Sequence, residues 1–255
     1  MRTGIALVVG VLLFALALLI EAPATLVDKW LAAASGERAR LADTRGTVWN
    51  GSGVLWLAPG FAGARIQWHL NATPLLWGEA RGSLRAEDGS SPRAIFALGN
   101  HGLVLRDVDL VLPADALLRA VAAPLPLTSA GGTVGLRADA LALRSDAFEG
   151  RAGLRWDGAN LQGPTPGTRI ALGDVRLDAV GDGKALNGTL SNAGGDVDIS
   201  GTTSLASDAM RAEVHVRPRE GIDAEHSRSI SSALALVGQP DARNGYRFVW
   251  SARRQ

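Results

Sequence analysis

The chain has 255 residues, a formal net charge of +1 and no cysteine. Its length allows one large domain or two small ones, and the lack of thiols excludes disulfides, metal–thiolate cages and cysteine redox chemistry. The balanced, scattered charge lacks the basic patch that a nucleic-acid-binding surface requires. The 31 glycines are spread along the chain, which is typical of many short strands joined by tight turns.

The first predicted element is an uncharged run from Gly4 to Ile20. As a helix it would be about 25 Å long at about 1.5 Å per residue, close to the lower limit for crossing a bilayer core of about 30 Å. Arg2 favours a cytoplasmic N-terminus, so we expect residues 1–21 to be a transmembrane signal-anchor, with the remaining chain across the membrane. A cleaved secretory signal ending near Ala22-Pro23-Ala24 is the alternative.

A short amphipathic helix is predicted over residues 22–36, directly after the apolar run. Pro23 suits a first helical turn, and Gly36 is a plausible stop. Lys29 and Trp30 are candidates, together with Arg2, for the membrane interface. The alternative is that this helix packs under the domain that follows, and the residues do not separate the two interpretations.

Residues 37–255 have the period of two that indicates antiparallel β-sheet with one buried and one solvated face. The segments that alternate most clearly are 65–71, 80–87, 151–157, 211–217 and 246–250. Two short helices are predicted, over Ala114–Ala122 and Ala224–Val237. The Pro-rich stretch 123–130 is the predicted seam between two β-halves.

No constellation of catalytic, metal-binding or cofactor-binding residues is evident. The histidines are far apart in the chain, and neither a nucleophile elbow nor a phosphate-binding loop is present. Asp174, Asp178 and Asp182 recur every fourth residue, but the alternation around them predicts a strand with acids at its turns. We therefore expect no enzymatic activity, no metal and no cofactor.

The tryptophans are the candidate interaction or groove residues, because several of them lie next to glycines in predicted strands. Glycine beside tryptophan allows a large ring to lie across neighbouring backbone. The alternative is that the rings fill the core of the sheet. The candidates are Trp49, Trp56, Trp68, Trp77 and Trp156.

The order of these motifs resembles the protein N subunit family of the bacterial type II secretion system. The matching segments are Pro23-Ala24-Thr25-Leu26, the Gly-Thr-x-Trp-x-Gly-x-Gly pattern from Gly46 to Gly53, the Trp68 strand with its Pro74 turn, Leu190-Ser191-Asn192-Ala193-Gly194-Gly195, and Leu236 to Asp241. Single motifs are short, and their shared order carries the resemblance. Between about Leu136 and Asp182 only the alternation matches.

The resemblance implies a mainly β protein: one N-terminal transmembrane helix, then a twisted antiparallel periplasmic sheet with two or three short helices. It implies an accessory inner-membrane subunit that contacts other platform proteins or the secretin during protein secretion. The expected localisation is the inner membrane, single-pass, with the C-terminal domain in the periplasm. The family is also similar to AsmA-like proteins with curved, lipid-binding sheets, so a membrane-tethered lipid-binding or lipid-transfer protein is the alternative.

Overall fold

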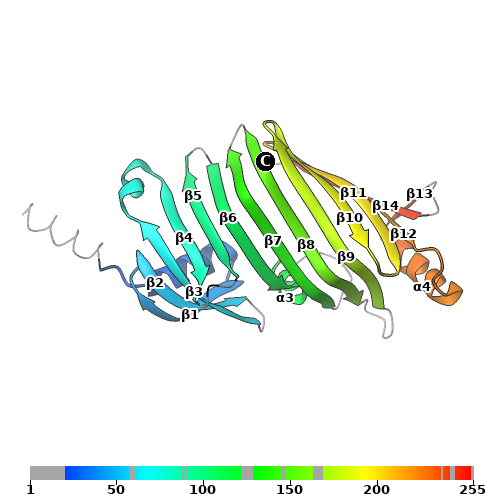
Figure 1. Ribbon diagram of the computed structural model, residues 1–255, viewed down its shortest axis with the longest axis horizontal. Helices are drawn as coiled ribbons and strands as arrows, with labels where there is room; N and C mark the ends of the chain where they lie inside the picture. The colour runs from blue at the N-terminus through cyan, green and yellow to red at the C-terminus, as the bar shows by residue number, and fades with distance from the viewer. Residues whose placement is uncertain are drawn as a thin grey trace, which may run out of the picture. The chain divides into compact units, whose positions relative to one another are not determined.

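The computed structural model describes residues 21–57, 61–87, 89, 91–100, 102–121, 129–144, 147–162, 169–236, 238–241 and 245–253 (Figure 1). The chain forms two compact units, Met1–Arg93 and Ala94–Gln255. Both units are built mainly from antiparallel strands. The predicted seam near 123–130 falls within the second unit, and residues 122–128 lie outside the described ones.

The described residues of the first unit form one α-helix, a sheet and one turn of 3-10 helix. The strands pair antiparallel in the order β1, β2, β3, β4. Helix α2 ends at Gly36, the residue predicted as its stop, which adopts a left-handed conformation. The elements are α2 (Thr25–Ser35), β1 (Ala39–Gly46), β2 (Asn50–Leu57), β3 (Phe61–Asn71), η1 (Thr73–Trp77) and β4 (Ala80–Ala86).

The core of this unit lies between α2 and one face of the sheet. Leu41, Ile66 and Trp68 are buried there, and Val27 and Leu31 of α2 pack against them. These strand residues belong to the apolar half of the alternation, so the sheet buries the face that the sequence indicates. The helix therefore completes a core that the sheet alone would leave exposed to water.

The described residues of the second unit form a longer antiparallel sheet together with the helices α3 and α4 (Figure 1). Its strands run in sequence order from β5 to β12, followed by β14 and then the short β13. The elements are β5 (Arg93–Gly99), β6 (Gly102–Pro113), α3 (Ala114–Val121), β7 (Ser129–Arg144), β8 (Phe148–Gln162), β9 (Arg169–Asp182), β10 (Ala185–Ala193), β11 (Val197–Ala206), β12 (Ala209–Pro218), α4 (Ala224–Ala235), β13 (Gln239–Asp241) and β14 (Gly245–Arg253).

The pairing of residues between neighbouring strands shows which residues lie on each face of this sheet. Direct partners on one face form an apolar row across eight strands: Leu110, Leu136, Leu154, Leu177, Leu190, Gly201, Val214 and Phe248. The adjacent row on the other face is Asp109, Arg137, Gly153, Asp178, Thr189, Thr202, Glu213 and Val249. We call the side of the first row the apolar face and the side of the second row the polar face.

Helices α3 and α4 cover part of the apolar face. Ala114 of α3 is buried with Val134, and Leu117 packs beside them. Ile230 of α4 is 1% exposed and packs in one cluster with Val175 and Val197. These strand residues lie where β6, β8, β10 and β12 end, so the helices protect one end of the strands.

The mainly β, antiparallel fold with few helices is confirmed. The segments predicted as strands correspond to parts of β3, β4, β8, β12 and β14, with 80–87 one residue longer than β4, and the two predicted helices correspond to α3 and α4. The predicted transmembrane helix falls on residues 1–20, outside the described part of the chain. Among the residues that are described, no helix has the length and apolar character needed to cross a membrane.

Candidate functional site

Trp68 is a core residue. Its side chain is 7% exposed, and its indole N–H donates to the backbone carbonyl of Val48 at 3.1 Å. Gly51 lies directly against the ring, and a Cβ there would overlap the indole. The Gly-Thr-x-Trp-x-Gly-x-Gly pattern therefore has a structural reason, because its first part makes the β1–β2 turn and its glycines provide the surface on which Trp68 rests.

Trp156 has the same role in the second unit. It is half-buried, packs beside Leu161 in the apolar clusters of β7, β8 and β9, and donates its indole N–H to Gly131 O at 2.8 Å. Both rings are thus fixed by a backbone carbonyl of a strand or turn that precedes them. Neither ring is free to close over a ligand.

The other candidate tryptophans, all in the first unit, differ in how exposed they are. Trp49 is half-buried, Trp56 is exposed on β2, and Trp77 is 71% exposed at the end of η1. Lys29 and Trp30 are exposed on α2, as an interfacial position requires, while Arg2 lies outside the described residues. Trp30, Trp56 and Trp77 are therefore surface residues of the first unit, whereas Trp68 belongs to its core.

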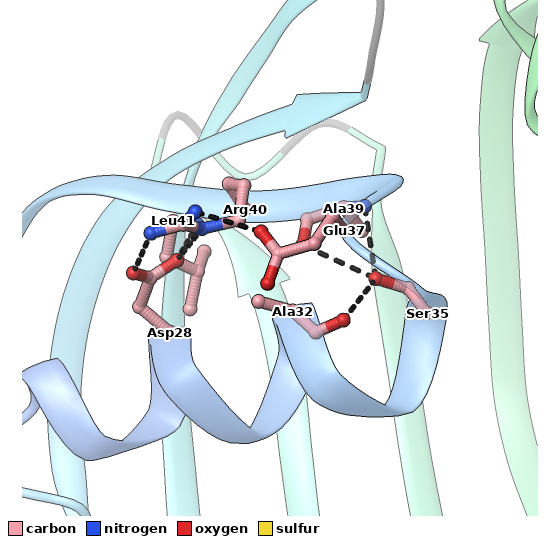
Figure 2. Close-up of polar contacts among 7 residues, drawn as sticks. All are labelled: Asp28, Ala32, Ser35, Glu37, Ala39, Arg40 and Leu41. Atoms are coloured by element: carbon pink, nitrogen blue, oxygen red, sulfur yellow. Dashed lines mark hydrogen bonds and ion pairs between the residues drawn. The ribbon is translucent and has the colours of Figure 1, made fainter.

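Polar groups of α2 and the following turn cap the outer edge of β1 (Figure 2). The Asp28 carboxylate accepts from the backbone N–H of Leu41 at 2.7 Å, and Ser35 Oγ accepts from Ala39 N–H at 3.0 Å. Arg40 makes two further bonds to Asp28, at 3.0 and 2.9 Å, and one to Glu37 at 2.9 Å. An edge strand with satisfied outward groups is a poor template for another strand.

Asp28 is electrostatically adapted to this capping role. Its hydrogen bond with Arg40 is the largest influence and lowers the pKa of the carboxyl group below its usual value. Partial burial acts in the opposite direction, while the bond from Leu41 N–H and the charge of Arg40 lower the pKa further. The carboxylate is therefore ionised, and acts only as an acceptor, throughout the neutral range.

Sequence reasoning missed a polar network at the turn between β10 and β11. Asn192 donates to Leu172 O at 2.6 Å and to Val197 O at 2.8 Å, and accepts from Ile199 N–H at 2.7 Å. It thereby joins the ends of β9, β10 and β11. The late Asn-x-Gly-Gly motif thus has a structural function. The motif itself was the only sign of this network in the sequence.

The same turn holds α4 through Asp196. Its carboxylate accepts from Ala171 N–H at 2.8 Å and lies 3.1 Å from His226 Nε2 of α4. Burial, the largest influence, would raise the pKa of Asp196, but these bonds and the charges of His226 and Arg219 outweigh it and lower the pKa. The outcome is an ionised acceptor that connects β9 to α4.

A second histidine–carboxylate contact holds β13. His215 of β12 lies 2.8 Å from Asp241 through Nδ1 and 3.3 Å from Glu213 through Nε2. His215 is half-buried beside these two acids, whereas His69 of β3 is exposed. The contact positions a strand and resembles no nucleophile–base pair.

The described residues offer little for chemistry on a small molecule. They contain no group of three or more His, Asp or Glu side chains arranged to hold a metal ion. A hollow on the first unit is lined by Arg45, Gln67, His69 and Arg85, together with Trp68. These side chains bring no acid and base together, so the surfaces that remain for function are the apolar face and the strand edges.

The family description "Type II secretion system (T2SS), protein N" matches residues 37–249. Neither a curated protein nor a solved structure matches the chain. The match includes both units and the motifs that form the Trp68 seat, the Asn192 network and β13. Family membership makes the chain a component of a type II secretion system and implies that it interacts with other components of that system. The chain belongs to the protein N family of type II secretion systems.

Proposed function

We propose that the protein is an accessory, non-enzymatic subunit of the inner-membrane platform of the type II secretion system. A signal-anchor over residues 1–21 holds it in the inner membrane, and residues 37–255 act in the periplasm by contact with other subunits. The match of the protein N family to residues 37–249 carries this proposal. The contacts of four side chains support it, because each serves packing or positioning: Trp68, Trp156, His215 and His226.

Co-purification tests the assembly role. The full chain, tagged at its C-terminus, is extracted in mild detergent from a bacterium that carries the system, and the captured proteins are identified by mass spectrometry. We expect other subunits of the type II system, and none with an equally tagged, unrelated inner-membrane protein. Capture that recovers no subunit of the system would contradict the proposal.

The proposed topology can be tested separately because the chain has no natural cysteine. Ser207→Cys places one thiol in an exposed turn between β11 and β12. A membrane-impermeant maleimide should label this thiol in cells with a permeabilised outer membrane and an intact inner membrane. Labelling that requires lysis of the inner membrane would place the domain in the cytoplasm instead.

Lipid binding is the second candidate function, and the shape of the apolar face favours it. Leu141, Gly150, Gly181 and Leu186 are successive register partners on this face. Leu186 nevertheless packs against the cluster that contains Leu141, although about 14 Å separates strands three spacings apart in a flat sheet. The sheet is therefore curved toward its apolar face here.

Mass spectrometry of lipids bound to the purified protein tests this alternative. Leu205→Asp introduces a charge on the exposed part of the apolar face, and Thr202→Asp introduces the same charge on the polar face of the same strand. If the face holds lipid, the first variant should lose it and the second should retain it. Absence of lipid from the unmodified protein, or equal retention by both variants, would refute lipid binding at this face.

A further inference from the structure

Strand β14 is paired along its whole length on one side only. Its residues 246–253 face β12, from Tyr246 opposite Val216 to Arg253 opposite Ala209. On the other side, β13 covers only Gly245, Tyr246 and Arg247. Among the described strands, none pairs with the second side of residues 248–253.

The backbone direction at this edge follows from Pro240 in β13. Pro240 is the partner of Tyr246 and has no N–H to donate, so this pair is of the non-hydrogen-bonded kind. Arg247 must then direct its N–H and C=O toward β13. Because these directions alternate along an antiparallel strand, Val249 and Ser251 direct their backbone groups toward the uncovered side.

The path of the chain before β13 explains why β13 pairs with only three residues of β14. Directly before β13, Gly238 lies against the ring of Phe248, and a Cβ there would come within 2.8 Å of Cζ. Gly238 N–H donates to Leu234 O of α4 at 2.8 Å. The chain therefore turns from α4 across the Phe248 ring instead of running along the edge of β14.

The uncovered segment is also open to solvent at its side chains. Val249 is 46% exposed on the polar face, and Trp250 is 53% exposed on the apolar face. The Trp250 ring stacks on that of Phe248, with centroids 6.2 Å apart. A strand added here would extend the apolar row beside two aromatic rings and satisfy backbone groups that water now solvates.

We propose that the edge of β14 from Phe248 to Arg253 binds an extended segment of another secretion-system subunit, which adds to the sheet as a strand. The occupant has apolar residues on the side of Trp250 and polar residues on the other side. On the polar face the direct neighbours of the occupant would be Val249 and Ser251, whose backbone groups point outward. This inference rests on the proposed function, since it names how the platform contact is made.

A matched pair of variants at Ser251 isolates the outward backbone group. Both Ser251→Pro and Ser251→Ala remove the hydroxyl, but only proline also removes the outward N–H. Proline is tolerated on edge strands where the N–H does not serve the ladder. Circular dichroism and urea unfolding should show that both variants fold, and Val249→Pro with Val249→Ala provides a second pair if Ser251→Pro does not.

We expect Ser251→Pro to reduce the amount of co-purified subunits about tenfold relative to Ser251→Ala, which corresponds to about 1.4 kcal/mol of binding free energy. In the assembled complex, hydrogen exchange at the amides of Val249 and Ser251 should slow about tenfold or more compared with the free protein. The amides of Phe248 and Trp250, which face β12, should change little.

The outcomes separate this inference from the proposed function. Co-purification of equal amounts with both Ser251 variants, together with unchanged exchange at residues 249 and 251, would refute strand addition and leave the subunit role intact. Recovery of no secretion subunit with the unmodified chain would refute the proposed function itself. Protection that appears in the purified protein alone and rises with its concentration would identify a second copy as the occupant and refute the partner assignment.

Discussion

Strands β1 and β14 differ in how their outward backbone groups are satisfied, although each is paired along its full length with only one neighbour within its own unit. On β1, Asp28 and Ser35 of α2 accept the outward N–H groups of Leu41 and Ala39. On β14, the three residues of β13 cover the beginning, and Phe248 to Arg253 have no second strand among those described. One edge is thus protected by its own chain, whereas the other has the features of a binding edge.

The comparison shows that edge protection depends on nearby polar side chains more than on the strand itself. The helix beside β1 offers a carboxylate and a hydroxyl at the positions where N–H groups emerge. Helix α4 offers its polar contacts to the Asp196 turn instead, and Gly238 leads the chain away from β14. The predictions below test whether this difference has the energetic and functional consequences that we assign to it.

The largest effect is expected at the core that supports the capped edge. Trp68→Ala should lower the free energy of unfolding by about 3–5 kcal/mol, because it removes a buried indole and its bond to Val48. Trp77→Ala, at a ring that is mostly exposed, should change it by less than about 0.5 kcal/mol. Urea unfolding measures both, and equal losses would show that Trp68 does not anchor this unit.

Removal of the main cap should have the next largest effect. Asp28→Ala leaves the N–H of Leu41 without its acceptor, and we expect a loss of about 1–3 kcal/mol in the free energy of unfolding. Glu37→Ala removes only an exposed ion pair with Arg40 and should cost less than about 1 kcal/mol. If the two variants are equally stable, the cap is not an energetic feature of the β1 edge.

Two proline substitutions, one in β1 and one in β14, compare the two edges directly. Ala39→Pro removes an outward N–H that is bonded to Ser35 Oγ, whereas Ser251→Pro removes one that faces the uncovered side of β14. We expect the first to cost about 1 kcal/mol more than the second, each measured against its own reference, unmodified Ala39 and Ser251→Ala. A larger cost at Ser251 would mean that the β14 edge is already satisfied in the free protein.

Acid should weaken both regions by a smaller amount. The pKa values of Asp28 and Asp196 are lowered on folding, so each carboxylate contributes stability above its unfolded pKa of about 3.8, which is lost as the pH falls through its folded value. The effect is smaller than that of deletion, because a protonated carboxyl can still accept one bond. The free energy of unfolding is measured from pH 7 to pH 2. Below pH 4 it should depend less on pH in Asp28→Asn and in Asp196→Asn than in the unmodified protein. Unchanged profiles would contradict the lowered pKa values.

Much of the fold follows from local patterns in the sequence. The alternation of 151–157 and 211–217 predicts β8 and β12 with their apolar residues on one face, and Gly36 marks the end of α2 correctly. The candidate site was harder to predict. Trp68 and Trp156 satisfy the stated alternative of core packing, while the network of Asn192, Asp196 and His226 joins residues far apart in the chain and has no local signature.

The sequence by itself determined the strands, the separation of an apolar from a polar face, and membership in the protein N family. These properties depend on side-chain period and motif order, both of which are local. Only the tertiary structure decided which edges are closed, because every strand carries the same backbone donors and acceptors whatever its side chains. Whether those groups meet Asp28, β13 or open solvent depends on where α2, Gly238 and α4 lie once the sheet has formed.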